Sequence, residues 1–103
     1  MSYKLIVSKE AHNDIDDIVS YIAIELYSPA AAKGFLDDVE KSYKTVIDNP
    51  RIYGFCNDYR LHKEGYRKII IKNYLILYRI DDEQKTVLVV RIIYGGRNYT
   101  ELP

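Results

Sequence analysis

The side chains of this sequence that could take part in chemistry are mainly arginines and tyrosines. Tyrosine accounts for 11 of the 103 residues. A tyrosine ring can stack on a nucleobase, and arginine together with tyrosine could stabilise charge and transfer a proton during phosphodiester cleavage. Tyr94, Arg97 and Tyr99 lie close together in the sequence, around Gly95-Gly96. They are therefore candidates for a reactive or phosphate-binding group.

Other kinds of reactive site are not predicted. The residues that could bind zinc are His12, Cys56 and His62, and they do not form the closely spaced pairs that zinc sites use. No metal ion and no other cofactor is therefore expected. Cys56 is interpreted as structural rather than as a nucleophile. The Gly95-Gly96 pair does not lead into a helix, so it does not predict a phosphate-binding loop.

Several of the polar and aromatic residues have a structural explanation. Tyrosine is favoured in strands and suits a half-buried sheet. Tyr74 and Tyr78 are in phase with the isoleucines of the same segment, so both are expected to lie in the core. Asp14 and Asp17 lie off the apolar stripe of a predicted helix, and solvation explains them better than a pair of catalytic carboxylates.

The N-terminal half predicts one strand followed by two long helices. Residues 3–7 are rich in strand formers and end at Ser8, a good helix N-cap. Apolar residues then recur at helical spacing over about residues 9–27. Ser28-Pro29 predicts the start of a second helix, which continues to Asn49-Pro50, because the residue before a proline avoids the helical conformation. With so short a link, the two helices should form an antiparallel hairpin.

The C-terminal half predicts an ordered loop over residues 51–65 and then three strands. Residues 66–71 and 74–80 flank Lys72-Asn73, a two-residue hairpin turn, and residues 86–94 form the last strand. The order β-α-α-β-β-β predicts an α+β fold, in which the helical hairpin covers one face of a small, mainly antiparallel sheet and the first strand lies beside the last. Strict alternation in the last strand would turn an apolar set toward the helices: Leu88, Val90 and Ile92.

Length and composition limit the class of protein. Residues 1–103 are expected to form a single domain, and the single cysteine excludes a disulfide-stapled secreted class. No apolar run approaches the ~18 residues of a membrane span, and none resembles a signal peptide, so a cytoplasmic location without membrane contact is expected. The formal net charge is zero, but residues 1–50 carry −4 and residues 51–103 carry +4. This split predicts an acidic face and a basic face.

Several motifs, in their order and spacing, resemble the RelE/ParE superfamily of toxins from type II toxin–antitoxin modules, also called plasmid stabilisation proteins. The first predicted helix carries the family's spaced pattern: Ala11, Asp14, Ile15, Ile18 and Tyr21. Further matches extend nearly to the C-terminus: Ala32, Phe35, Asn49-Pro50, Gly54, Arg67, Tyr74, Tyr78, Arg79, Ile80, Gly95, Gly96 and Arg97. The family's element order agrees with the order predicted above from the residues alone.

The resemblance implies one of two cellular targets. RelE-like members cut messenger RNA on the ribosome, whereas ParE-like members poison DNA gyrase. The RNA-cutting branch has an arginine at the place of Leu75, and many members have a histidine at the place of Tyr94. Leucine cannot stabilise a developing charge, and tyrosine, with an ordinary pKa of ~10, is a poor base at neutral pH.

These departures favour the ParE side, that is, inhibition of DNA gyrase. The alternative is a ribosome-dependent endoribonuclease that uses Arg67, Arg97, Tyr94 and Tyr99. A third interpretation is a degenerate toxin that still binds its antitoxin but has no target.

The resemblance also implies a cognate antitoxin as partner. The sheet face turned away from the helices is expected to be exposed and to mix apolar with basic residues, and an apolar, acidic antitoxin segment is expected to bind there and along the helical hairpin. The candidate residues for binding antitoxin or target are Arg67, Arg79, Arg91, Leu75 and Leu77, with Val87 and Val89 on the same face. The oligomeric state is left open between a dimer and a toxin–antitoxin hetero-oligomer.

Overall fold

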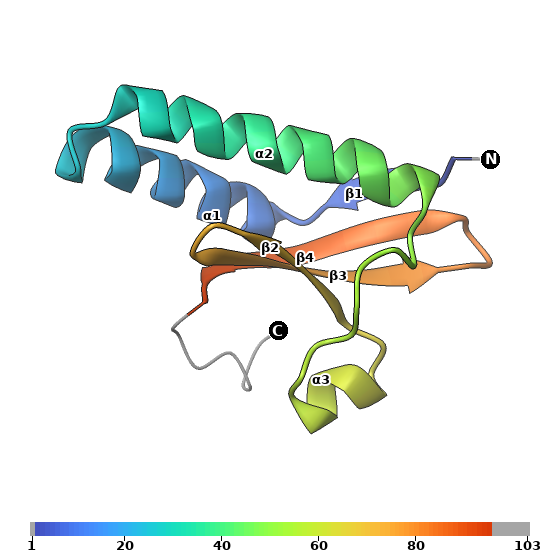
Figure 1. Ribbon diagram of the computed structural model, residues 1–103. Helices are drawn as coiled ribbons and strands as arrows, with labels where there is room; N and C mark the ends of the chain where they lie inside the picture. The colour runs from blue at the N-terminus through green and yellow to red at the C-terminus, as the bar shows by residue number, and fades with distance from the viewer. Residues whose placement is uncertain (1, 96–103) are drawn as a thin grey trace.

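The computed structural model describes residues 2–95, which form a layer of two long helices packed on a four-stranded sheet (Figure 1). The elements in chain order are β1 (Lys4–Val7), α1 (Lys9–Ser20), a π-helical continuation η1 (Tyr21–Glu25), α2 (Pro29–Asp48), α3 (Tyr59–Lys63), β2 (Arg67–Ile71), β3 (Tyr74–Asp81) and β4 (Thr86–Tyr94). The strands lie in the order β1-β4-β3-β2, with β1 parallel to β4 and the other pairs antiparallel. The predicted α+β fold, with its first strand beside its last, is confirmed.

The helix boundaries follow from capping groups. The Ser8 hydroxyl accepts a hydrogen bond from the Ala11 N–H at 3.0 Å, and the Ser28 hydroxyl accepts one from the Ala31 N–H at 3.2 Å. Each bond satisfies one of the N–H groups that a helix start leaves unpaired. Helix α2 ends at Asp48, before Asn49-Pro50 as predicted, and Figure 1 shows α1 and α2 running antiparallel.

The predicted loop over residues 51–65 contains a helix that sequence analysis missed. Helix α3 is five residues long, and the Asp58 side chain caps it by accepting from the Leu61 N–H at 3.0 Å. Such a length is too short to show a helical repeat of apolar residues. Its one buried residue, Leu61, is fully inaccessible to solvent.

The main core lies between the helical layer and the sheet. Its buried members are Ala11, Ile22, Ala32, Phe35, Val39, Val46, Ile69, Ile71, Ile76, Tyr78, Val87, Val89 and Ile92. Tyr78 is completely buried and its hydroxyl donates to the Pro50 carbonyl at 2.7 Å, while Tyr74 packs against the same core. The predicted core positions of both tyrosines are confirmed.

A β-bulge in β4 overturns the predicted facing of that strand. Leu77 pairs with Arg91 but Tyr78 pairs with Val89, so Val90 is an extra residue in the ladder. An extra residue reverses the alternation of side chains beyond it. Val89 therefore faces the helices before the bulge and Ile92 after it. The prediction was right for Ile92, but it was wrong for Val90, which packs on the opposite face, and for Leu88, which is outside the main core.

Candidate functional site

The sheet face turned away from α1 and α2 is covered rather than exposed. Leu75 and Leu77 are 9% and 0% exposed, in a second core whose other buried members are Cys56, Leu61, Tyr66 and Ile93. Figure 1 shows α3 on the opposite side of the sheet from the two long helices. The expectation that Leu75 and Leu77 lie on an exposed face is therefore wrong, because α3 and its flanking segments cover them. Val87 and Val89 lie in the main core, so they are not on that face at all.

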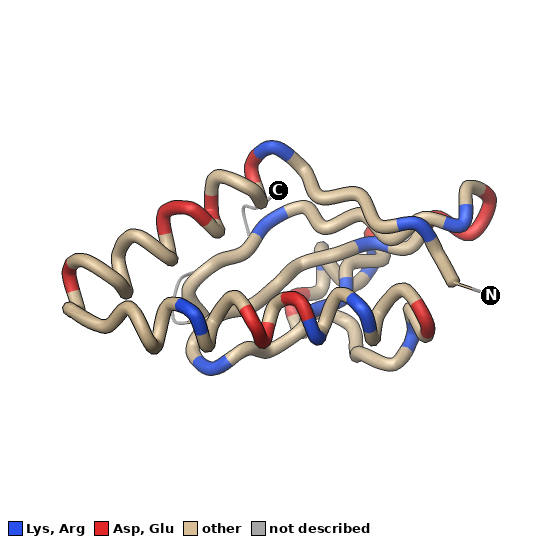
Figure 2. Tube along the Cα trace, turned by 90° about the horizontal axis from the view of Figure 1, so that it is seen from above, with Lys and Arg blue, Asp and Glu red and all other residues tan. Residues whose placement is uncertain are grey.

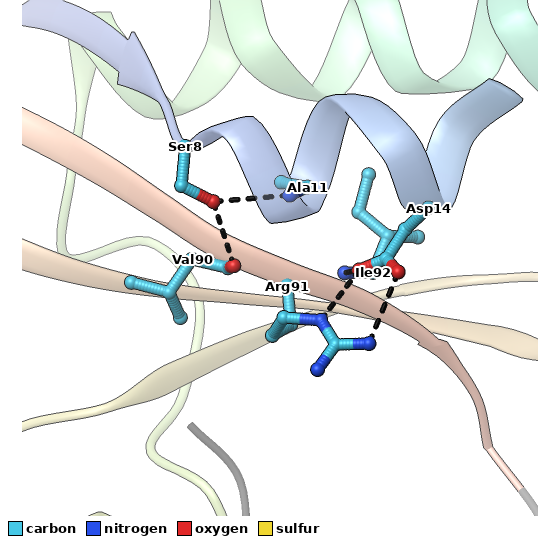
Figure 3. A network of polar contacts seen from close by, with 6 residues as sticks. All are labelled: Ser8, Ala11, Asp14, Val90, Arg91 and Ile92. Atoms are coloured by element: carbon cyan, nitrogen blue, oxygen red, sulfur yellow. Dashed lines mark hydrogen bonds and ion pairs between the residues drawn. The ribbon is translucent and has the colours of Figure 1, made fainter.

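Arg91 is held by an ion pair within the molecule. Its Nε donates to Asp14 Oδ2 at 2.7 Å and its Nη2 donates to Asp14 Oδ1 at 3.0 Å (Figure 3). The two side chains are 21% and 15% exposed. These hydrogen bonds raise the pKa of Arg91 above its usual range, against the opposing effect of burial. The expectation that Arg91 lies on an exposed binding face is therefore wrong, as is the interpretation of Asp14 as a solvated acid.

The same network supports the end of β4. Strand β1 stops at Val7, opposite Val89, whereas β4 continues to Tyr94. Beyond that point the Ser8 hydroxyl donates to the Val90 carbonyl at 2.8 Å, and Asp14 Oδ2 accepts from the Ile92 N–H at 2.9 Å (Figure 3). Side chains of α1 and of its cap thus replace the missing strand as hydrogen-bond partners. Asp17, by contrast, is exposed as predicted.

Arg67 is half-buried at the start of β2 and has two partners. Its Nη1 donates to the Tyr53 carbonyl at 2.7 Å, and its guanidinium lies 4.0 Å from the centre of the Phe55 ring. The other ring stacked on Phe55 is that of His62, with 4.4 Å between ring centres. A cation over an aromatic face is attracted by the ring quadrupole. Arg67, Phe55 and His62 therefore form one cluster that joins β2 to the segment around α3.

Of the predicted site residues that lie within residues 2–95, Arg79 and Tyr94 are exposed. The Arg79 guanidinium lies 5.1 Å from the centre of the Tyr66 ring. Tyr94 is 56% exposed, and its ring meets that of Tyr74 edge-on at 6.0 Å. Burial, followed by two neighbouring tyrosines that include Tyr94, raises the pKa of Tyr74.

The structure does not bring Arg67 and Tyr94 together. In the sheet Arg67 lies opposite Tyr78, whereas Tyr94 lies opposite Tyr74. These two positions of β3 are four residue steps apart, which corresponds to ~13 Å along the strand direction. The other two candidates, Arg97 and Tyr99, lie outside the described residues.

Cys56 is placed as a structural group, in the second core. Cys56 is buried, and burial raises the pKa of its thiol. A raised pKa lowers the thiolate fraction and with it the reactivity. Among residues 2–95, no group of three or more histidine, cysteine, aspartate or glutamate side chains could hold a metal ion.

The two predicted charge faces are only partly present. Figure 2 shows acidic residues along α1, but basic and acidic residues alternate along α2. Two lysines of α2 pair with acids one turn away, Lys33 with Asp37 at 3.1 Å and Lys44 with Glu40 at 3.3 Å. Such exposed pairs offset the charge of the helix and contribute little to stability.

The end of the helical hairpin carries an apolar surface that sequence analysis did not identify. Tyr21, Ile24, Leu26 and Tyr27 are 51%, 66%, 54% and 89% exposed. Figure 1 shows this end of the hairpin projecting past the sheet, which is why its apolar residues lack a sheet surface to cover them. Tyr27 has a φ of 51°, an unfavourable backbone conformation for a bulky residue. Ile24, Leu26 and Tyr27 do not lie on one helical face. This break in periodicity is the sequence feature that could have indicated an exposed apolar surface here.

No helix among residues 2–95 has the length and apolar character needed to cross a membrane.

The fold matches solved structures of toxins. The chain superposes with a TM-score of 0.72 on the chromosomal ParDE system of Pseudomonas aeruginosa, at 18% identity, covering 90% of this chain and 96% of that one. It superposes with a TM-score of 0.63 on the RelBE2 toxin–antitoxin complex of Mycobacterium tuberculosis, at 21% identity, covering 91% and 99%. For a mutant of the Escherichia coli toxin RelE in the free state the TM-score is 0.68, at 17% identity, covering 98% and 92%. These superpositions show a shared fold, and at such low identity they show the fold alone.

Family membership rests on the sequence comparison. No curated protein matches the chain. The family model described as the ParE toxin of the type II toxin–antitoxin system, parDE, matches residues 5–99. The matched span contains every element from α1 to β4, all of β1 but its first residue, and the Asp14–Arg91 pair that joins α1 to β4. The chain therefore belongs to the ParE family and is a toxin of a type II toxin–antitoxin system.

Proposed function

We propose that this toxin inhibits growth by acting on DNA gyrase and that a cognate antitoxin neutralises it. The family supplies the basis for both parts, and the structural neighbours from Pseudomonas aeruginosa and Mycobacterium tuberculosis are parts of toxin–antitoxin systems. The choice between gyrase and messenger RNA depends on the side chains of this chain.

The observation that carries the choice is the separation of the candidate ribonuclease residues. General acid–base catalysis requires the catalytic groups to reach the same phosphodiester at hydrogen-bond distance. Arg67 and Tyr94 lie ~13 Å apart along the strand direction, and Arg67 already donates to the Tyr53 carbonyl and covers Phe55. This arrangement supports a structural role for Arg67 rather than one in cleavage.

A second observation favours the same choice. Leu75, where the resemblance places the arginine of RNA-cutting relatives, is buried in the second core. A well-placed charge-stabilising donor contributes about 2.7–4 kcal/mol to a transition state, or 10²–10³ in rate. A buried leucine cannot supply that contribution, and it faces protein rather than solvent.

Two assays on the purified full chain test the proposal side by side. The first measures gyrase supercoiling of relaxed plasmid at increasing toxin concentration. The second adds the toxin to programmed ribosomes and maps the 5′ ends of the messenger. We expect loss of supercoiling and an unchanged messenger.

Each other outcome contradicts the proposal in its own way. Codon-phased cuts that disappear with Tyr94→Phe would establish the ribonuclease instead. If neither supercoiling nor the messenger were affected while the antitoxin bound tightly, the protein would be a degenerate toxin.

A further inference from the structure

The apolar surface at the end of the helical hairpin has a defined backbone. We call it the hairpin tip, and it consists of Tyr21, Ile24, Leu26 and Tyr27. The Leu26 N–H donates to the Tyr21 carbonyl at 3.1 Å, and the Tyr27 N–H donates to the Ile24 carbonyl at 3.4 Å. The first bond joins residues five apart, the π-helical pattern of η1, and such turns occur frequently at functional sites. Both bonds tie the link between the helices back onto η1.

Tyr27 carries backbone strain that its packing does not offset. Its φ of 51° is the left-handed conformation that helices adopt just past their end, where glycine is the usual residue. A bulky residue in this conformation costs free energy. The Tyr27 side chain is 89% exposed, so contacts within the chain compensate little of that cost. Strain retained at an exposed aromatic residue points to a role in binding rather than in folding.

The hairpin tip is large for an uncovered apolar surface on a small protein. The exposed fractions of its four side chains add up to between two and three whole side chains, roughly 500 Å² of largely apolar surface. A patch of this size on a monomer often marks a protein interaction site. Figure 1 shows the end of the hairpin projecting past the sheet, so the described part of the chain leaves it accessible to a partner.

The α1 side of the hairpin tip is acidic. Asp17 lies on α1 one turn before the tip, and Glu25 lies within it. Both are exposed, and neither has an ion pair within the described residues. Figure 2 shows further acidic residues along α1. The α2 side carries two lysines: Lys33 pairs with Asp37 at 3.1 Å, and the amine of Lys72 lies beside α2.

The area and the charges together select the occupant. A second copy that presented the same tip would bring acids opposite acids, and the two tips would supply less than the ~800 Å² per partner of a standard interface. The acidic antitoxin segment expected from the sequence would be repelled in the same way, and so would the phosphates of a nucleic acid. A protein that itself binds DNA presents lysines and arginines to the phosphates, so its surface has the complementary charge.

We propose that the hairpin tip is the surface with which this toxin binds its target protein, at a basic surface of gyrase that includes an apolar pocket. The inference rests on the proposed function and assigns the toxin's side of that contact. Tyr27 and Ile24 fill the apolar pocket, and Asp17 and Glu25 face the lysines and arginines around it. Tyrosine is one of the residues that contribute most to the affinity of such interfaces.

The main test compares two tyrosine variants of the full-length toxin, by Kd for gyrase and by the toxin concentration that halves supercoiling. Tyr27→Asn removes the ring and suits the left-handed conformation, which asparagine tolerates. We expect both quantities to rise about tenfold or more, with a Tm equal to or above that of wild type. The matched control is Tyr59→Asn, because Tyr59 is 78% exposed on α3, and it should change both quantities less than about twofold.

A charge test accompanies it. Glu25→Lys should raise the Kd for gyrase about fivefold or more and should weaken its dependence on salt. Glu83→Lys is the control, because Glu83 is an exposed acid of the β3–β4 turn, and it should change the Kd less than about twofold.

Four results would overturn the inference. If wild-type toxin inhibited gyrase and both Tyr27→Asn and Glu25→Lys inhibited it equally well, the contact would lie elsewhere and the proposed function would stand. If Tyr27→Asn weakened binding of the antitoxin but not inhibition of gyrase, the tip would belong to the antitoxin. If wild-type toxin self-associated and Tyr27→Asn abolished only that, the occupant would be a second copy. If wild-type toxin did not bind gyrase, the proposed function would fail, and this contact with it.

Discussion

Replacing Asp14 by alanine should strongly destabilise this protein, although the sequence places Asp14 off the apolar stripe of its helix. Asp14 accepts two hydrogen bonds from Arg91 and one from the Ile92 N–H, at 2.7, 3.0 and 2.9 Å. The substitution removes all three and leaves a guanidinium that is 21% exposed without its counter-charge.

The size of the effect follows from burial. Removing one partner of a fully buried ion pair costs about 3–5 kcal/mol, and a hydrogen bond to a charged group contributes about 1.5–3 kcal/mol. Because water still reaches part of this pair, the lower end applies, and we expect Asp14→Ala to lower the free energy of unfolding by about 3 kcal/mol. For a domain of this size that corresponds to a fall in Tm of ~12–24 °C.

Urea and thermal unfolding followed by circular dichroism measure the change. Asp17→Ala is the matched control, because Asp17 is an exposed acid of the same helix, and it should stay within ~0.5 kcal/mol of wild type. Asp14→Asn should lose less than Asp14→Ala, since its amide oxygen can still accept from the Ile92 N–H. The double variant Asp14→Ala/Arg91→Met should be more stable than Asp14→Ala alone, because Arg91→Met removes the uncompensated charge.

This reasoning would be refuted if Asp14→Ala lowered the free energy of unfolding no more than Asp17→Ala does. It would also be refuted if the effects of Asp14→Ala and Arg91→Met on the free energy of unfolding were strictly additive in the double variant, since the two side chains would then not interact.

Three further predictions follow from buried or paired groups. Leu77→Ala should lower stability by about 3 kcal/mol in urea unfolding, because it opens a cavity in the second core, whereas a surface leucine would change it by less than ~0.5 kcal/mol. Burial raises the pKa of Tyr78 and of Tyr43 to about 12 from 10.0, so stability present below pH 10 should be lost as the pH rises toward 12. A late step in tyrosinate absorbance should accompany that loss and shrink in Tyr78→Phe; its absence would contradict the burial. Hydrogen bonds from Arg51 and a tyrosine hydroxyl lower the pKa of Asp82 below 3.8, so its contribution is complete above that pH and is lost as the pH falls through the lowered pKa. Asp82→Asn should therefore flatten the acid side of the stability profile, and an unchanged profile would count against the pair.

The sequence by itself determined the elements whose signals are local. Ser8 and Ser28-Pro29 start the helices, Asn49-Pro50 ends the second, and Lys72-Asn73 turns the hairpin. In each case the residues that decide the conformation lie within about four positions of one another, which is the reach of a cap or a tight turn. The order of elements and the place of β1 beside β4 followed from them. So did the core positions of Tyr74 and Tyr78, because their spacing matched that of neighbouring isoleucines.

Only the tertiary structure decided which side chains remain available for binding. The Asp14–Arg91 contact joins residues 77 positions apart, and the bulge at Val90 depends on how β4 meets β3. Neither leaves a periodic trace in the sequence, so Val89 and Val90 were assigned to the wrong faces of the sheet. Helix α3 then covers Leu75 and Leu77 on a face that an isolated three-strand meander would expose. Alternation along a strand predicts which residues share a face, but what covers that face depends on contacts between segments distant in the chain.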